Sequence, residues 1–189
     1  MRRFLGFVIL ILTLVIPWTA GATIVKSFST AGMTAAAHDI VRGFVVAQEA
    51  VYDSKRKHVY THTTVRVEED LSRPLTRPLN TSRLIIVRQL GGATGGIQSV
   101  LVGNARLELG EEVVLFARTD GVFHYLVGMA QGKYSVWRSG NGPPKLRRSL
   151  QGIVTIRPSP IARPQAANLL SLAALRHMVK SALKEEASR

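Results

Sequence analysis

The alternation of apolar and polar positions between residues 37 and 137 predicts a run of short β-strands. From His58 to Leu71 the apolar and β-branched residues recur at every second position, which is the period of a half-buried strand. The inward positions of this segment are Val59, Thr61, Thr63, Val65 and Val67. The stretch Asp39–Tyr52 is longer and more apolar, and Gly43 inside it predicts a bulge or sharp bend. We expect the other strands to be organised around Asp39–Tyr52.

Shorter apolar segments predict the remaining strands of the same domain. They cover residues 23–28, 83–90, 97–102, 113–117, 122–128 and 131–137. Thr119-Asp120-Gly121 carries the Asp-Gly signature of a tight hairpin, and residues 131–137 are expected to close a barrel. Ser29–Ala37 predicts one or two helical turns, because a Ser precedes an alanine-rich run. Short antiparallel strands with little helix indicate a mainly β fold, a small barrel or sandwich.

The chain changes character after Trp137. Residues 139–164 are rich in Pro and Gly and are predicted to be a linker, in which residues 150–156 have the pattern of an edge strand. Residues 165–189 predict an amphipathic, basic C-terminal helix. Leu169, Leu172, Leu175, Val179 and Leu183 fall on one side of it, and Arg176, Lys180 and Lys184 form a basic stripe beside them. We expect this helix to dock on the domain; the alternative is a helix that binds a membrane surface or a partner.

The N-terminal residues 1–22 have the pattern of a secretory signal peptide. Two arginines precede an apolar run from Phe4 to Ile16, and Ala20 and Ala22 fit the small-residue rule for cleavage after Ala22. An uncleaved anchor is less favoured, because a helix of that length spans roughly 20 Å of a hydrocarbon core about 30 Å thick. No later run is long enough to cross a bilayer. We therefore expect an exported protein, periplasmic or extracellular.

The positive charge of the chain is concentrated toward its C-terminus. The net charge is +13, and Lys133–Arg189 holds eleven Lys and Arg against two acidic residues. Thr23–Gly132, by contrast, holds twelve basic and ten acidic residues. A basic C-terminal part would attract an anionic surface such as an envelope polymer or phospholipid headgroups. The candidate binding residues for such a surface are Arg147, Arg148, Arg176, Lys180 and Lys184.

No set of residues forms a recognisable catalytic or metal-binding motif. The chain has no cysteine, which excludes disulfides and thiolate chemistry. His58 and His62 lie four apart on one strand, about 13 Å, too far to share a metal, and each is most simply a surface residue. Adjacent acids such as Glu68-Glu69 and Glu111-Glu112 point to opposite faces of a strand and are expected to lie near basic groups. We expect no enzyme activity, no cofactor and no metal.

Nucleic acid is not an expected partner either. Tyr125, Tyr134 and Trp137 would suit a stacking face of the kind that nucleic-acid-binding barrels use. Aromatic residues make up only 6% of the chain, and core packing explains these three more simply.

Three segments of the predicted strands carry a recognisable pattern. Ala37–Val46 reads small-x-Asp-Ile-Val-x-Gly-x-Val-Val, and the other two segments are Tyr60–Val67 and Leu109–Phe116. They resemble, in this order, the first barrel strand, the following hairpin and the entry into the fourth strand of the netrin-like domains, which include the tissue inhibitors of metalloproteinases and many secreted bacterial proteins. The resemblance covers residues 23–137. It implies a small antiparallel OB-like β-barrel over residues 23–138, followed here by the C-terminal helix.

One feature of that family is missing, and it concerns function. The metalloproteinase inhibitors place an N-terminal Cys-x-Cys on the protease zinc, whereas the mature chain here would start Thr23-Ile24-Val25. Together with the signal-peptide pattern and the missing catalytic motif, the resemblance favours an exported, non-enzymatic binding module, inhibitor-like in a broad sense, that meets an unknown protein partner through loops such as Arg73–Thr81 and Gly91–Gly96. The alternative is an envelope-associated protein held to an anionic surface by its basic C-terminal part.

Overall fold

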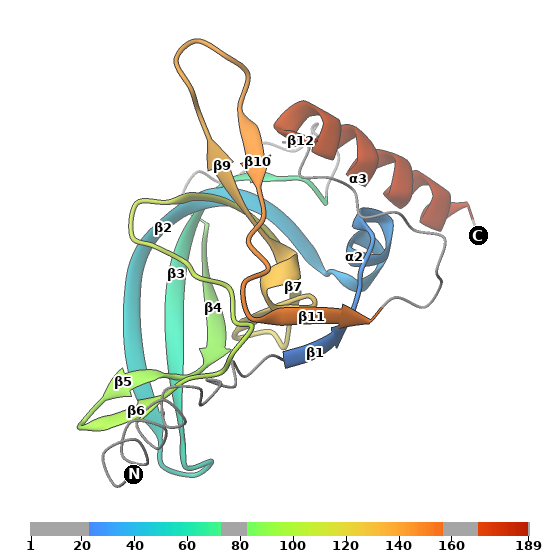
Figure 1. The fold of residues 1–189 in the computed structure, drawn as a ribbon. Coiled ribbons are helices and arrows are strands. Elements are labelled where there is room, and N and C mark those ends of the chain that lie inside the picture. Colours follow the sequence, from blue (N-terminus) through green and yellow to red (C-terminus); the bar gives the residue numbers. More distant parts are fainter. Residues whose placement is uncertain (1–22, 73–82, 157–169, 189) are drawn as a thin grey trace, which may run out of the picture.

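The computed structural model describes residues 23–72, 83–156 and 170–188. It confirms the predicted fold class: the chain is mainly β, with a closed five-stranded barrel and a C-terminal helix (Figure 1). The segments 1–22 and 73–82, which include the expected signal peptide and one expected binding loop, lie outside the described residues. The elements are β1 (Thr23–Lys26), α2 (Thr30–Ala36), β2 (Asp39–Asp53), β3 (His58–Asp70), β4 (Leu84–Leu90), β5 (Gly92–Thr94), β6 (Ile97–Ser99), β7 (Glu112–Thr119), β8 (His124–Leu126), the 3₁₀ helix η2 (Met129–Gly132), β9 (Lys133–Trp137), β10 (Lys145–Arg147), β11 (Ile153–Ile156), β12 (Leu170–Ser171) and α3 (Leu172–Ala187).

The barrel is a ring of strands in the order β7–β2–β3–β4–β8, and β8 closes it. β8 pairs antiparallel with β7 and parallel with β4, where Val87 lies opposite His124. The expectation that residues 131–137 close the barrel is therefore wrong. The Asp120-Gly121 turn folds the chain directly back on β7, so β8 takes that place first. β9 also lies along β7, but it leads outward to β10 and β12.

β2 is irregular and bends at Gly43, as the sequence predicts. The pairing of β2 with β3 shifts register between Arg42 and Gly43. A Cβ atom at Gly43 would lie 2.2 Å from the carbonyl oxygen of Arg66, so only glycine permits this approach. β2 pairs with β7 over Asp39–Phe44, across the bend, and with β3 from Val41 to Asp53, where the two strands continue beyond the barrel as a long curved hairpin (Figure 1).

The apolar core forms two clusters on opposite sides of the barrel wall. The inner cluster consists of Val41, Val45, Val65, Val67, Ile85, Val87, Leu107, Val113 and Leu115. The outer cluster lies under the helices and includes Met33, Ile40, Phe116, Leu175 and Val179. Strand β7 contributes to both, with Val113 and Leu115 facing inward and Val114 and Phe116 facing outward. Burial on both faces explains why this segment is continuously apolar.

The C-terminal part packs on the barrel. Leu172, Leu175 and Val179 of α3 are buried in the outer cluster, which confirms the predicted docking of the helix, and the Ser171 hydroxyl accepts a hydrogen bond from Ala174 N at its start. The predicted edge strand forms as β11, but its partner is β1, in a separate parallel pair. None of the helices in the described ranges is long and apolar enough to cross a membrane.

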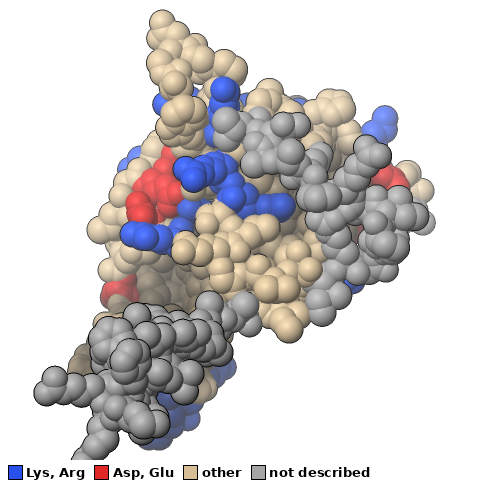
Figure 2. Space-filling model, viewed as in Figure 1, with Lys and Arg blue, Asp and Glu red and all other residues tan. Residues whose placement is uncertain are grey.

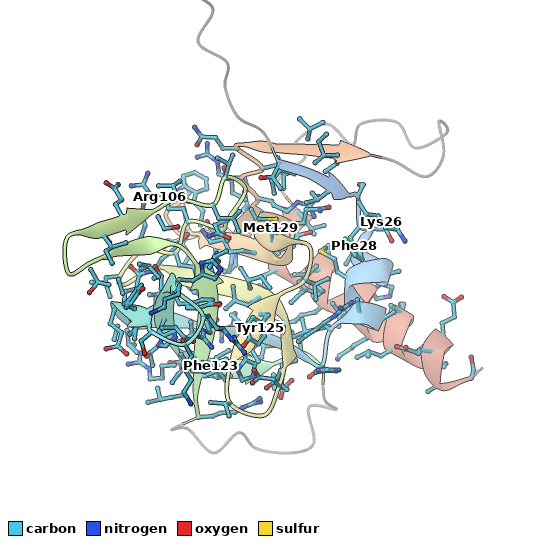
Figure 3. All side chains as sticks on the ribbon, turned by 90° about the horizontal axis from the view of Figure 1, so that it is seen from below. Lys26, Phe28, Arg106, Phe123, Tyr125 and Met129 are labelled. Carbon is cyan, nitrogen blue, oxygen red and sulfur yellow. The ribbon has the colours of Figure 1, made fainter. Side chains whose placement is uncertain are left out.

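A buried glutamine fastens the N-terminal segment to the barrel. Gln131 Oε1 accepts a hydrogen bond from Phe28 N at 2.9 Å, and its Nε2 donates to Lys26 O at 2.9 Å. Lys26 and Phe28 lie beside the loop that carries Met129 (Figure 3). Because the amide of Gln131 is fully buried, these bonds are protected from water and fix the path of the chain between β1 and α2.

Candidate functional site

Aromatic and cationic side chains gather on one outer face of the barrel. This cluster, termed the arginine–aromatic platform, consists of Tyr60, His62, Arg88, Phe123 and Tyr125. Tyr60 and His62 alternate on β3, and Arg88 lies opposite His62 on β4. Residues directly opposite on paired strands share a face. Phe123 and Tyr125 come from the β7–β8 hairpin and lie on the same side of the barrel (Figure 3).

Arg88 is the centre of the platform. Its guanidinium carbon lies 3.7 Å from the Tyr60 ring centroid and 4.8 Å from the Phe123 ring centroid. Arg88 Nη2 donates to the Asp53 carboxylate at 3.2 Å. The side chain is 11% exposed, and its buried Nε has no hydrogen-bond partner among the described residues. Two cation–π contacts and one ion pair therefore hold this guanidinium in a single orientation.

His62 is part of this packing and not a free surface residue, which corrects the expectation from the sequence. Its ring stacks on Phe123 with a centroid distance of 4.8 Å, and its Nδ1 lies 3.8 Å from the Glu49 carboxylate. Burial lowers the pKa of His62, and the neighbouring Arg88 charge lowers it further. The imidazole is therefore neutral at pH 7 and acts as an apolar ring against Phe123.

Asp120 fixes the loop that carries Phe123. Its Oδ1 accepts hydrogen bonds from the backbone N–H groups of Phe123 and Val122, and its Oδ2 accepts one from the Tyr125 hydroxyl. These bonds, chiefly that from Phe123 N–H, lower the pKa of Asp120 to about 2. The loop is thus tied at both ends, and the Phe123 ring is presented against the barrel in one position.

Exposed apolar side chains extend the platform along the same face. Val51 on β2 lies opposite Tyr60, and Leu84 and Ile86 precede Arg88 on β4 at alternate positions. All three are exposed. β3 and β4 are the second and third strands of the barrel in chain order. In OB-type barrels the face of these two strands, with the adjoining hairpin loops, is the usual ligand face. Tyr, Phe and Arg beside apolar surface are the composition of a protein–protein interface core.

The five basic residues predicted to bind an anionic surface have different environments. Arg176 makes two hydrogen bonds to Glu69, at 2.7 and 2.6 Å, and Arg148 lies over the Tyr134 ring and donates to its hydroxyl. Arg147, Lys180 and Lys184 are exposed and have no side-chain partner among the described residues. Lys180 and Lys184 lie one turn apart on α3, whereas Arg147 is on β10. The predicted group is therefore divided between α3 and the region of β10, and the side chains of Arg148 and Arg176 already have partners within the protein.

The acidic pairs lie near basic groups, as expected. Glu69 and Glu112 belong to a chain of ion pairs whose order is Arg138–Glu112–Arg42–Glu69–Arg176. Burial raises the pKa of Glu69, but the hydrogen bonds from Arg176 and Arg42 outweigh it and leave the pKa below its usual value. Arg138 and Arg42 have the same net effect on the pKa of Glu112. Within the described part of the chain, no group of His, Asp and Glu is arranged to hold a metal ion.

The stacking face considered from the sequence, with Tyr125, Tyr134 and Trp137, does not form. Tyr134 packs in the outer core cluster, as expected, but Trp137 is exposed and Tyr125 belongs to the platform. The sequence did not indicate Arg88 or Phe123, because the platform forms only when β3, β4 and the β7–β8 loop meet. The sequence did show that Tyr60 and His62 occupy alternate, outward positions of β3, and this pattern indicated part of the platform.

No family model matches this chain, and neither a curated protein nor a solved structure matches it.

Proposed function

We propose that this chain is an exported, non-enzymatic binding module that docks a protein partner on the arginine–aromatic platform. The observation that carries the proposal is Arg88, held between Tyr60 and Phe123 and paired with Asp53. A rigid group loses little conformational entropy on binding, and Tyr and Arg are the residue types that most often dominate binding energy at protein interfaces.

The charges around the platform favour a protein over an anionic polymer. Lys55, Arg56 and Lys57 lie in the adjoining hairpin turn, but Asp53, Glu49 and Asp120 border the same region. Arg88 is already paired, so it offers little uncompensated charge to a phosphate chain. Exposed Val51, Leu84 and Ile86 instead supply apolar area that a protein partner would cover.

The proposal includes export of the protein and an inhibitor-like mode of docking. The signal-peptide pattern of residues 1–22 supports secretion or release into the periplasm. The resemblance of Ala37–Val46 to netrin-like domains supports an inhibitor-like mode of docking. Without the N-terminal cysteines, that docking would use the barrel face and not a wedge at Thr23.

Site-specific photo-crosslinking tests the proposal. A photoreactive amino acid at Ile86 reports on the platform, and the same residue at the exposed Leu109, in the loop before β7, is the matched control. We expect Ile86 to give a discrete crosslinked protein from the exported and envelope fractions, and Leu109 not to give it. Excess unlabelled protein should abolish the product, and a Val51→Glu competitor should not. Equal products from both positions, or none from Ile86, would contradict the proposal.

A second candidate function rests on α3. Lys180 and Lys184 are exposed on the docked helix and have no partner among the described residues, so both remain available to an anionic surface. Each basic residue near an anionic membrane contributes roughly 1 kcal/mol. This arrangement supports retention of the protein at an envelope polymer or membrane as an activity separate from the platform.

A further inference from the structure

A half-open cavity of about 400 Å³, with both polar and apolar lining, lies between the loop before β7 and strands β9 and β10. Arg106, at its rim, is well separated from Phe123 and Tyr125 of the platform (Figure 3). Basic side chains gather beside acidic ones below the β9–β10 hairpin on the face drawn in Figure 2. The cavity is thus separate from the platform, and a ligand bound in it would not depend on the proposed function.

A buried lysine is held by two hydrogen bonds in the cavity. Lys133 is 8% exposed, and its ammonium donates to Glu111 Oε1 at 2.6 Å and to Ser135 Oγ at 2.8 Å. The Ser135 hydroxyl donates to the same carboxylate oxygen at 2.6 Å, and the other oxygen of Glu111 accepts from Glu108 N. Two of the three N–H groups of Lys133 are used, so one donor is left beside an oriented hydroxyl.

Arg147 brings an uncompensated positive charge to the same cavity. It lies directly opposite Ser135 in the β9–β10 pair, and side chains at opposed positions share a face. Arg147 is exposed and has no partner among the described residues. A guanidinium at this position can bind a carboxylate through two parallel hydrogen bonds.

The lining residues define the class of ligand. Arg106, Lys133 and Arg147 carry positive charge and Glu108 and Glu111 negative charge, which leaves a net charge of +1 and favours a monoanion. Asn104, Ser149 and Gln151 add amide and hydroxyl groups suited to a polyhydroxylated molecule. Among the described residues that line the cavity none is aromatic, so they offer no surface for stacking a nucleobase. Its volume is in the range of small-molecule sites.

We propose that this cavity binds a carboxylated sugar of monosaccharide size. Arg147 binds the carboxylate, while Lys133, Ser135 and Gln151 meet the hydroxyl groups. A phosphorylated sugar fits less well, because a phosphate monoester carries nearly two negative charges at pH 7.

Titration of the purified protein with glucuronate and galacturonate, followed by ¹H–¹⁵N NMR, tests this inference. Glucose, acetate and glucose 6-phosphate are the comparison probes. We expect saturable shifts of the Lys133, Ser135 and Arg147 amides with at least one uronate, and binding about tenfold weaker or more for each comparison probe. Equal affinity for glucose would overturn the role of the carboxylate, and tighter binding of glucose 6-phosphate would overturn the choice of a monoanion. Absence of saturable binding by both uronates would overturn the site.

Two neighbouring arginines provide matched variants. Arg147→Gln should weaken uronate binding about tenfold or more, because Arg147 is the lining guanidinium without a partner among the described residues, whereas Arg106 is paired with Glu108. Arg148→Gln makes the same change of charge one residue later, at a side chain that packs on Tyr134 and does not line the cavity, and should change the Kd less than twofold. Thermal melts of both variants report on folding. Equal loss of binding in two folded variants would overturn the assignment of Arg147.

Discussion

The guanidinium of Arg176 on α3 and the carboxylate of Glu69 on β3 share two hydrogen bonds, at 2.7 and 2.6 Å. Glu69 also accepts from Arg42, so one carboxylate joins the C-terminal helix to the barrel wall. The basic stripe predicted on this helix is therefore not uniform. Its first member is a structural contact, and only Lys180 and Lys184 face solvent.

Removal of the Arg176 side-chain charge should loosen α3. Arg176→Gln leaves Glu69 with Arg42 as its remaining partner, and we expect the free energy of unfolding to fall by about 1 kcal/mol, because the pair is partly exposed to solvent. Urea unfolding measures this loss. Lys180→Gln, four residues later and without a partner, is the control and should stay within about 0.5 kcal/mol of the parent. Equal stability of the parent and both variants would contradict this role for Arg176.

The ion-pair chain predicts a loss of stability in acid. The pKa values of Glu69 and Glu112 are lower in the folded protein than their usual value of 4.5. Their contribution is thus complete above that value and is lost as the pH falls through the folded-state pKa values. Thermal melts should give a steady Tm between about pH 7 and pH 5 and a fall below about pH 4.5. In Glu69→Gln the fall should be shallower; an identical pH dependence in parent and variant would exclude Glu69 as a contributor.

A charge in the barrel interior should prevent stable folding. Val45 and Val65 lie directly opposite each other and are 1% and 0% exposed, as predicted from the strand patterns. Replacement of either by Asp would bury an unpaired carboxylate and should cost several kcal/mol of folding free energy. Val46→Asp is the matched control, because Val46 is the exposed bulge residue next to Val45. Urea unfolding measures this loss. Equal free energies of unfolding for Val45→Asp and Val46→Asp would contradict the assignment of the inner core.

Attachment to anionic surfaces should depend on the two free lysines of α3. A truncated chain ending at Ser139 is unsuited to this test, since it would lack Leu146 and Leu175 of the outer core cluster. We expect Lys180→Glu/Lys184→Glu to reduce retention on anionic vesicles at low salt, and high salt to remove retention of the parent. The control is Lys55→Glu/Lys57→Glu in the β2–β3 turn, which makes the same change of charge. Equal losses in the two double variants would show that net charge, and not α3, governs binding.

The exported protein should begin at Thr23. The small residues Ala20 and Ala22 predict cleavage after Ala22. N-terminal sequencing or intact-mass measurement of the protein from the exported fraction checks this prediction. A chain that still begins with Met1 would show an uncleaved segment.

Local patterns in the sequence were sufficient for much of the fold. The alternation from Val59 to Val67 identified the inward face of β3, and Gly43 marked the bend in β2, because both effects depend on neighbouring residues alone. The closing strand was misassigned, since the apolar segments at 124–126 and 133–137 are similar and both pair with β7. Which of them also reaches β4 depends on the three-dimensional path of the chain.

The candidate sites were harder to infer for the same reason. Arg88 looks like one more polar position on a strand until Tyr60 and Phe123 enclose it. Lys133 was counted among the basic residues of the C-terminal part, although it lies buried against Glu111. Charge counting treats Lys133, Arg147 and Arg176 alike, whereas burial and available partners give each a different role.

The pairing of β1 with β11 has a consequence for biogenesis. β1 stands at the beginning of the described chain, and its partner strand is made only after all five barrel strands have been synthesised. During synthesis, the segment that follows the predicted cleavage site therefore has no strand partner, so an export machinery would receive it unpaired. The closing of Thr23–Lys26 on Ile153–Ile156 would then be a late step of assembly, since only β12 and α3 of the described elements are made after β11.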